Sequence, residues 1–175
     1  YPCIKIPSLL RTAAGTLLAL AEARTPDCGD FAATDLVAKR SRDGGRTWSA
    51  LRKLVNLTAS EQKHGGVCGH PVAVGNAAPV QLSATDAHHP GRILVPHTRS
   101  NWEVWVTHSD DDGASWAPAR RIPGVVTRNA SDPGAGPDCN RSMAYFGLNS
   151  TGSLLQWVKQ LGWSTPGADP FAMWG

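Results

Sequence analysis

Residues 41–48 read SRDGGRTW, and residues 109–116 read SDDDGASW. Both segments fit the pattern S-x-D-x-G-x-[TS]-W, which fixes five residue classes within eight positions. A match of this length, found twice in one chain, indicates an internal structural repeat. The copies are separated by more than the ~20–50 residues of common repeats, so we expect an insertion or an extra strand between them.

Each copy has the composition of a tight β-hairpin turn. Asp43 and Asp111 can accept hydrogen bonds from backbone N–H groups of their own turn, as in Asx turns. Gly45 and Gly113 supply a position at which a positive φ costs little. The tryptophan that ends each copy then packs back onto the turn. We therefore assign both aspartates a structural role; the alternative, a calcium loop, lacks the series of oxygen ligands that an EF-hand requires.

The composition favours a β-rich domain. At 175 residues, the chain has the length of one ordinary domain. Only 18% of the residues are charged, and the 18 glycines and 13 prolines favour short strands with frequent turns. No stretch approaches the ~20 apolar residues that span a membrane, so no transmembrane segment is predicted. The net charge is only +3 and the basic residues are scattered, which argues against nucleic acid binding.

Apolar runs bounded by turn residues predict the positions of the strands. They lie at 4–10, 16–20, 34–40, 48–54, 71–82 (as strand, loop and strand), 92–97, 102–108 and 153–158. Segments 61–70 and 124–141 read as irregular loops, and no stretch has the pattern of a capped amphipathic helix. The sequence thus predicts an all-β domain over residues 1–175, with no internal boundary.

Repeated hairpin units bury their faces only against neighbouring units. Two such units would leave exposed faces at both ends, and the chain begins at Tyr1 rather than at a methionine. We therefore expect this chain to be a part of a longer protein.

Cysteines and glycosylation motifs bear on the compartment. The chain has four cysteines, Cys3, Cys28, Cys68 and Cys139. They allow three disulfide pairings, among which the sequence does not choose. Acceptor motifs for N-glycosylation occur at Asn56, Asn129, Asn140 and Asn149. These four glycosylation motifs favour the secretory pathway, with a lysosomal, extracellular or cell-surface location.

A metal site is the weaker interpretation of the histidines and one of the cysteines. His64, Cys68 and His70 lie close together in the sequence, and His88 and His89 follow. Their spacing does not follow the paired ligand pattern of zinc sites, and we expect Cys68 to form a disulfide. No metal site is therefore predicted at these residues.

Further segments resemble motifs of the sialidase (neuraminidase) family in order and spacing. They are IKIPS at 4–8, close to an F/Y-R-I-P motif; GTLLALAEAR at 15–24; D-x4-DLVAKRS at 30–41; and VGNAAPV at 74–80. In that family the repeated turn is the Asp-box, or BNR repeat. The resemblance runs from residue 1 to about residue 121 and is weak beyond it. The combination is specific, whereas an Asp-box alone is not.

The resemblance implies a fold and an activity. The fold would be a six-bladed β-propeller with its active site at the centre of one face, of which residues 1–175 form about the first two to three blades. The implied activity is exo-α-sialidase hydrolysis of terminal sialic acids from glycoproteins, glycolipids or oligosaccharides. In the family, three arginines bind the carboxylate, a tyrosine activated by a glutamate is the nucleophile, and an aspartate is the general acid/base. The resemblance also implies that this chemistry needs no metal and no other cofactor.

Three residues of this chain match family positions. Asp30 stands where the family has its acid/base aspartate, with Asp27 as the nearest competitor; a general acid requires a raised pKa, which burial under a bound sugar could supply. Arg24 stands where the family has an additional substrate-binding arginine in the pocket, which supports the carboxylate or the ring substituents of the sialic acid. Lys5 occupies the position of the first carboxylate-binding arginine and keeps the charge without the bidentate geometry.

The nucleophile half of the site has no counterpart in this chain. Tyr145 lacks the setting of the nucleophilic tyrosine, and two arginines and a glutamate are also unmatched. We therefore predict that the isolated chain is inactive, so that measurable sialoside turnover by it would refute this prediction. The alternative is an inactive Asp-box propeller that binds glycans or proteins. A serine or cysteine hydrolase is not supported, because the chain has no G-x-S-x-G motif.

Overall fold

The computed structural model describes residues 1–30, 32–64, 66, 70–100 and 103–126. The strand predicted at 153–158, most of the loop predicted at 124–141, and Tyr145 lie outside the described residues. So do Cys68, Cys139 and the last three glycosylation motifs.

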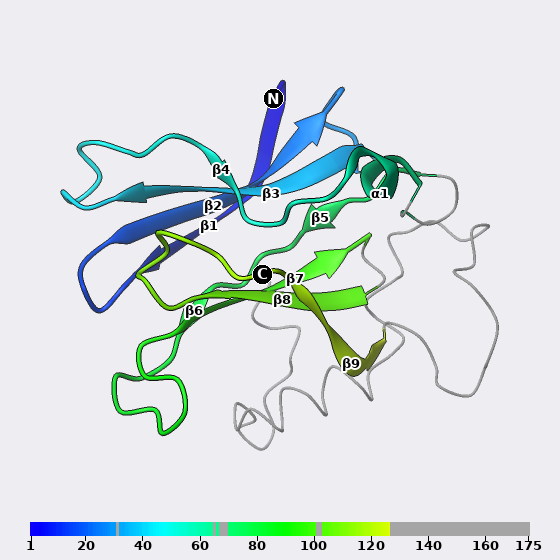
Figure 1. The fold of residues 1–175 in the computed structure, drawn as a ribbon. Coiled ribbons are helices and arrows are strands. Elements are labelled where there is room, and N and C mark those ends of the chain that lie inside the picture. Colours follow the sequence, from blue (N-terminus) through cyan, green and yellow to red (C-terminus); the bar gives the residue numbers. More distant parts are fainter. Residues whose placement is uncertain (31, 65, 67–69, 101–102, 127–175) are drawn as a thin grey trace, which may run out of the picture.

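Two antiparallel sheets make up the described part of the chain (Figure 1). The first has the order β1-β2-β3-β4, with β1 at Cys3–Arg11, β2 at Leu17–Thr25, β3 at Ala33–Ser41 and β4 at Arg52–Lys53. The second has the order β5-β7-β8-β9, with β6 also paired to β7; the strands are β5 (Val74–Gly75), β6 (Val80–Gln81), β7 (Ile93–Arg99), β8 (Glu103–Ser109) and β9 (Arg120–Val126). The all-β prediction is confirmed for these residues.

Some local predictions were wrong. The strand predicted at 48–54 shortens to the two-residue β4, and β9 extends to Val126, where a loop was predicted from residue 124. A short helix, α1 (Ala59–His64), lies in a region predicted to have none. Its signal is a capping box: the Glu61 N–H donates to Thr58 Oγ1 at 3.1 Å, and the Thr58 N–H donates to Glu61 Oε2 at 2.9 Å.

The two sheets pack face to face around one apolar core. Its buried members come from both sheets and the segments beside them: Leu18, Leu20, Leu36, Ala38, Leu54, Val55, Val72, Val74, Ile93 and Val95. Because side chains alternate along a strand, Leu18 and Leu20 place the even-numbered residues of β2 on the face that meets the second sheet. The same alternation brings Glu22 and Arg24, further along β2, to that face.

Both Asp-box turns have the hydrogen bonds predicted for them. The Asp43 carboxylate accepts from the Thr47 N–H at 2.9 Å and from the Thr47 hydroxyl at 2.6 Å. Asp111 repeats this with Ser115, at 2.8 Å and 2.6 Å. The structural role predicted for the two aspartates is therefore confirmed.

These hydrogen bonds make the stability of the chain pH-dependent. Hydrogen bonds from Thr47 lower the pKa of Asp43 to about 2. Burial raises the pKa of Asp111, but hydrogen bonds from Ser115 and Ser109 outweigh it and lower this pKa to about 2 as well. Because both folded values lie below the ordinary value of 3.8, the stabilisation is complete above about pH 4 and is lost as the pH falls towards about 2.

We therefore expect the urea concentration at the midpoint of unfolding to decrease as the pH is lowered from 5 to 2.5. The Asp43→Asn/Asp111→Asn double variant should show a flatter dependence over the same range, since it lacks both titrating carboxylates. An equally steep dependence in the double variant would assign the effect to other groups.

Polar contacts also join the two sheets beside the second Asp-box. Arg40 Nη2 of β3 lies 3.3 Å from Asp112 Oδ2, and the Thr16 hydroxyl donates to the same oxygen. Arg52 Nη1 donates to the Ala114 carbonyl at 2.7 Å. The turn of one sheet is thereby fixed against the strands of the other.

Candidate functional site

A buried ion pair lies on β2 at the end of the core. The side chains of Glu22 and Arg24 are each only 7% exposed. They are two residues apart on one strand and hence on the same face, and this face continues the apolar row of Leu18 and Leu20. Charged side chains at such positions require partners, because an unpaired buried charge is costly.

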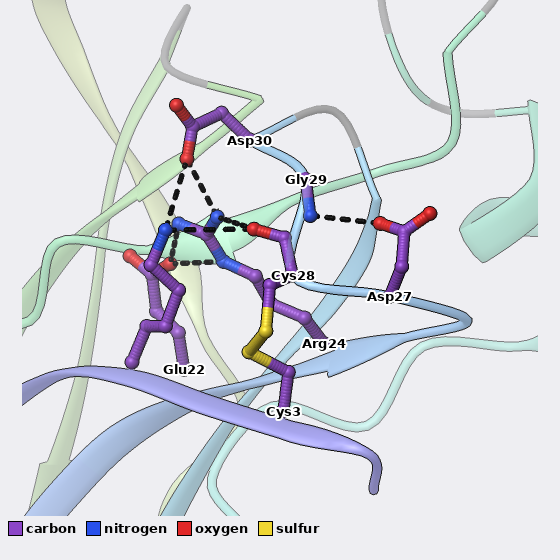
Figure 2. The surroundings of a disulfide bond; sticks show 8 residues. Cys3, Glu22, Arg24, Asp27, Cys28, Gly29 and Asp30 are labelled. Atoms are coloured by element: carbon purple, nitrogen blue, oxygen red, sulfur yellow. Dashed lines mark hydrogen bonds and ion pairs between the residues drawn. A yellow bond between two sulfur atoms is a disulfide. The ribbon is translucent and has the colours of Figure 1, made fainter.

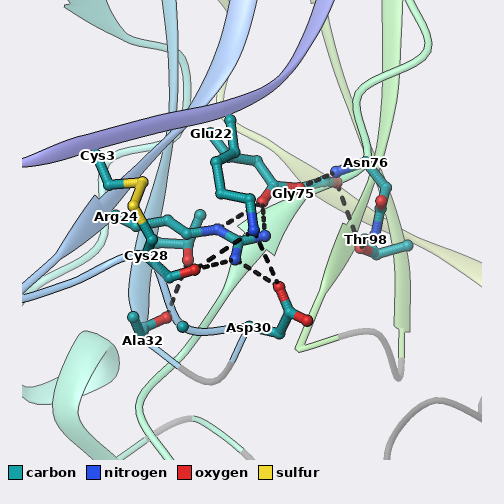
Figure 3. A network of polar contacts seen from close by, with 12 residues as sticks. Cys3, Glu22, Arg24, Cys28, Asp30, Ala32, Gly75, Asn76 and Thr98 are labelled. Atoms are coloured by element: carbon teal, nitrogen blue, oxygen red, sulfur yellow. Dashed lines mark hydrogen bonds and ion pairs between the residues drawn. A yellow bond between two sulfur atoms is a disulfide. The ribbon is translucent and has the colours of Figure 1, made fainter.

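The Arg24 guanidinium joins a buried carboxylate to an exposed one (Figure 3). Its Nε and Nη2 donate to Glu22 Oε2 at 3.1 Å and 2.7 Å. Its Nη1 donates to Asp30 Oδ1 at 2.6 Å and to the Cys28 carbonyl at 2.9 Å. All three nitrogens of Arg24 are therefore engaged within the protein, which fixes the orientation of the guanidinium plane.

Glu22 also connects the first sheet to the second. Its Oε1 accepts a hydrogen bond from the backbone N–H of Asn76 at 2.9 Å, directly after β5. A Cβ atom at Gly75 would lie 2.2 Å from this oxygen, so only glycine leaves room for the carboxylate. The position of Arg24 thus depends on contact between the two sheets.

Asp30 is the exposed member of the cluster. Its side chain is 75% exposed, and Oδ1 lies 3.6 Å from Lys5 Nζ as well as 2.6 Å from Arg24 Nη1. The hydrogen bond from Arg24, its charge and the charge of Lys5 lower the pKa of Asp30 below its ordinary value. Asp30 is therefore a carboxylate at neutral pH, able to accept a proton.

A disulfide fixes the segment that carries Asp30 (Figure 2). It joins Cys28 to Cys3 at the start of β1, which settles one of the pairings that the sequence left open. Asp27, the competitor of Asp30, instead accepts a hydrogen bond from the Gly29 N–H at 2.7 Å. Its carboxylate stabilises the turn, whereas the carboxylate of Asp30 contacts the two cations.

The structure thus brings the three sequence-predicted residues, Lys5, Arg24 and Asp30, into one cluster. Glu22 is part of the motif at 15–24, but the sequence predicted no role for it. The signal for Glu22 was its spacing from Arg24, because residues two positions apart on a strand lie on the same face of the sheet. The contribution of Asn76 had no signal in the sequence, since it donates through its backbone.

A third carboxylate, Asp35 of β3, has a structural role. It is buried and accepts from the Tyr1 hydroxyl at 2.7 Å and from Gln62 Nε2 at 3.3 Å, and Lys53 Nζ lies 2.7 Å away. These contacts attach the start of the chain and α1 to the first sheet. The contacts of Asp35 are therefore those of a structural residue.

A cavity of about 350 Å³ lies elsewhere, between the segment that follows β4 and the second sheet, and none of Lys5, Arg24 and Asp30 lines it. Its lining includes Leu57, His97, Arg99, Trp105 and Trp116.

Among the residues that the structure describes, no group of three or more His, Cys, Asp or Glu side chains is arranged to hold a metal ion. Over the same residues, no helix is long and apolar enough to cross a membrane.

Comparisons with known proteins show what the chain is similar to. No family model matches the sequence. The chain is 30% identical over 115 residues to a sialidase of Paraclostridium sordellii, covering 65% of this chain and 28% of that protein. It is 27% identical over 115 residues to a sialidase of Clostridium perfringens (65% and 30% covered) and 29% identical over 138 residues to an exo-alpha-sialidase of Aspergillus fumigatus (67% and 32% covered).

A solved structure has a fold similar to that of this chain. The chain superposes on a Hadza microbial sialidase with a TM-score of 0.55 at 22% identity, covering 68% of this chain and 26% of that one. At this identity the likeness concerns the fold. The chain spans less than a third of the length of the curated relatives that it matches. Over the part that matches, the chain is similar in sequence to these sialidases.

Proposed function

We propose that this chain is the N-terminal part of a six-bladed sialidase propeller and carries the acid/base half of its site. The two sheets would be its first blades, packed as neighbours. The observation that carries the proposal is the cluster at the end of the core, where Asp30, Arg24 and Lys5 meet within hydrogen-bonding or ion-pairing distance.

The ligand would be a terminal sialic acid, whose carboxylate needs a cation. Lys5 is the accessible one, with 39% of its side chain exposed, whereas Arg24 is buried and each of its three nitrogens already donates to Glu22, Asp30 or Cys28. We therefore assign the carboxylate contact to Lys5 and a positioning role to Arg24. An ammonium binds the carboxylate as a point charge, without the bidentate geometry of arginine.

Asp30 would serve as the general acid/base. Its lowered pKa makes it a base in the unoccupied site, whereas protonating the glycosidic oxygen requires a raised pKa. A bound sialic acid would supply this change, because its carboxylate offsets the charge of Lys5 and the sugar excludes water from Asp30. Asp30 would then donate its proton to the leaving-group oxygen and later recover one from water.

The substrates would be sialylated glycoproteins, glycolipids or oligosaccharides. The Cys3–Cys28 disulfide supports an oxidising compartment, and hence the secretory, lysosomal or cell-surface location expected from the sequence. No residue of this chain is assigned as the nucleophile, so turnover is expected only in a longer protein that supplies it.

Binding tests this proposal without turnover. N-acetylneuraminic acid, titrated into the ¹⁵N-labelled 175-residue chain, should shift the amide signals of residues near Lys5 and Asp30. Lys5→Arg should tighten binding by about tenfold, since a guanidinium can bind the carboxylate through two hydrogen bonds. Lys5→Met should abolish it.

Lys39→Met provides the control, because it removes one positive charge from an exposed lysine of β3 and should leave binding unchanged. Equal loss in both methionine variants would indicate a general charge effect. Shifts confined to other parts of the chain would refute the assignment of the site.

One observation favours a second candidate, an inactive propeller that binds glycans or proteins. Lysine replaces the arginine of the family motif at residue 5, and the neighbouring arginine has no free nitrogen. Hydrolysis of a fluorogenic sialoside by a longer protein containing this chain, increased by Lys5→Arg, would support the enzyme. Binding without hydrolysis in both forms would support the module.

A further inference from the structure

The disulfide between Cys3 and Cys28 connects the two segments that carry the charged cluster. Cys3 lies on β1 directly opposite Arg24, and Lys5, two residues on, lies opposite Glu22. Cys28 lies in the segment that follows β2, two residues before Asp30. The cross-link therefore joins the strand of Lys5 to the segment of Asp30.

The Cys28 carbonyl and the Asp30 carboxylate share the same two cations. The carbonyl accepts from Arg24 Nη1 at 2.9 Å and from Lys5 Nζ at 3.4 Å. Asp30 Oδ1 lies 2.6 Å and 3.6 Å from the same two atoms. Any displacement of Cys28 would therefore move both acceptors away from the cations together.

Non-covalent contacts alone hold this segment weakly. Asp30 is mostly exposed, and exposed ion pairs contribute little because water competes for both partners. Ordering a loop costs conformational entropy, which a cross-link reduces by restricting the open states. The covalent attachment of Cys28 to β1 thus favours the contacts of Asp30 over open arrangements of the segment.

We propose that the Cys3–Cys28 disulfide positions Asp30 against Arg24 and Lys5 and makes the site sensitive to thiols. With the disulfide closed, Asp30 and the cations form the cluster described above. With it open, segment 26–30 separates from β1 and the site binds an anionic sugar more weakly. The binding part of this proposal rests on the proposed sialidase function; the positioning part does not.

The opening step needs a dithiol reductant, such as dithiothreitol. Cys28 is exposed and Cys3 is buried, so a thiolate of the reagent attacks Cys28 Sγ and Cys3 leaves as a thiolate, which takes up a proton. The second thiol of the reagent, as its thiolate, then attacks the mixed disulfide and releases Cys28. The disulfide gains two electrons and two protons as two thiols, and the reagent becomes a cyclic disulfide.

Asp30 itself provides a readout that does not require a ligand. In the oxidised chain its ¹³Cγ signal should titrate below the ordinary range of an aspartate, because Arg24 and Lys5 stabilise the carboxylate. Reduction, or the Cys3→Ser/Cys28→Ser variant, should move this titration up towards the ordinary range. Re-oxidation should restore it in the wild-type chain only.

Controls separate positioning from general stability. The Cys68→Ser/Cys139→Ser variant keeps the Cys3–Cys28 disulfide and should respond to dithiothreitol as the wild type does. The amide signals of β7 and β8 should stay in place on reduction. An unchanged Asp30 titration overturns the proposal, and so does the collapse of all β-sheet signals, which would make the disulfide a staple of the whole fold.

Titration with N-acetylneuraminic acid completes the test. We expect the dissociation constant to rise by about tenfold on reduction, as one lost contact would produce. If the oxidised chain does not bind this sugar at all, the proposed function fails, while the Asp30 titration still decides the positioning role. If the sugar binds equally well with and without the disulfide, the thiol sensitivity is refuted.

Discussion

Replacing Glu22 by glutamine will lower the free energy of unfolding by about 3 kcal/mol. The substitution keeps the size of the side chain but removes the charge that compensates the buried Arg24 guanidinium. It also places an amide NH₂ opposite the Nε and Nη2 donors of Arg24, or opposite the backbone N–H of Asn76. Breaking a buried ion pair costs about 3–5 kcal/mol. We expect the lower end of this range, because Asp30 and the Cys28 carbonyl still contact Arg24.

Urea unfolding of the wild type and the variant at pH 7 measures this difference. Glu103→Gln is the matched control, since Glu103 pairs with Arg121 at 3.3 Å in a more exposed setting. Its change should stay within about 1 kcal/mol, as for other surface ion pairs. Equal effects in the two variants would contradict the special cost that we assign to the buried pair.

Only some parts of the site could be predicted from the sequence. Lys5, Arg24 and Asp30 lie in segments 4–8, 15–24 and 30–41, whose order resembles family motifs, so their proximity could be anticipated. Glu22 binds the N–H of Asn76, 54 positions further along the chain, and a backbone donor leaves no mark in the sequence. The pairing of Cys3 with Cys28 is likewise one of several that the four cysteines allow.

The fold shows the same division between local and long-range causes. The Asp-box turns at 41–48 and 109–116 were predicted because their hydrogen bonds join residues of one short segment. Helix α1 was not predicted, although its capping box at Thr58 and Glu61 is a local signal that the sequence contains. Strand β9 contains proline and glycine and is a strand because β8 pairs with it, a tertiary effect that propensity does not reveal.

Gly113→Ala will destabilise the chain by about 2–4 kcal/mol, whereas the equivalent change in the first Asp-box, Gly45→Ala, will cost only about 1 kcal/mol. Both glycines have a positive φ, of 77° and 92°, so the backbone strain of an added Cβ is common to the two variants. They differ in their surroundings. A Cβ at Gly113 would lie 2.7 Å from Leu18 Cδ2, whereas the nearest atom to one at Gly45 is Leu17 Cδ1, at 3.6 Å.

The contrast follows from the packing of the two sheets. The second turn lies against the core residue Leu18, so an added methyl group must displace a fully buried side chain. The first turn has no such neighbour on it among the described residues, and its alanine meets only ordinary contacts. Urea unfolding of the two variants side by side measures the difference. If Gly45→Ala proved as costly as Gly113→Ala, backbone strain alone would account for both, and the second Asp-box would not be packed against Leu18 as described.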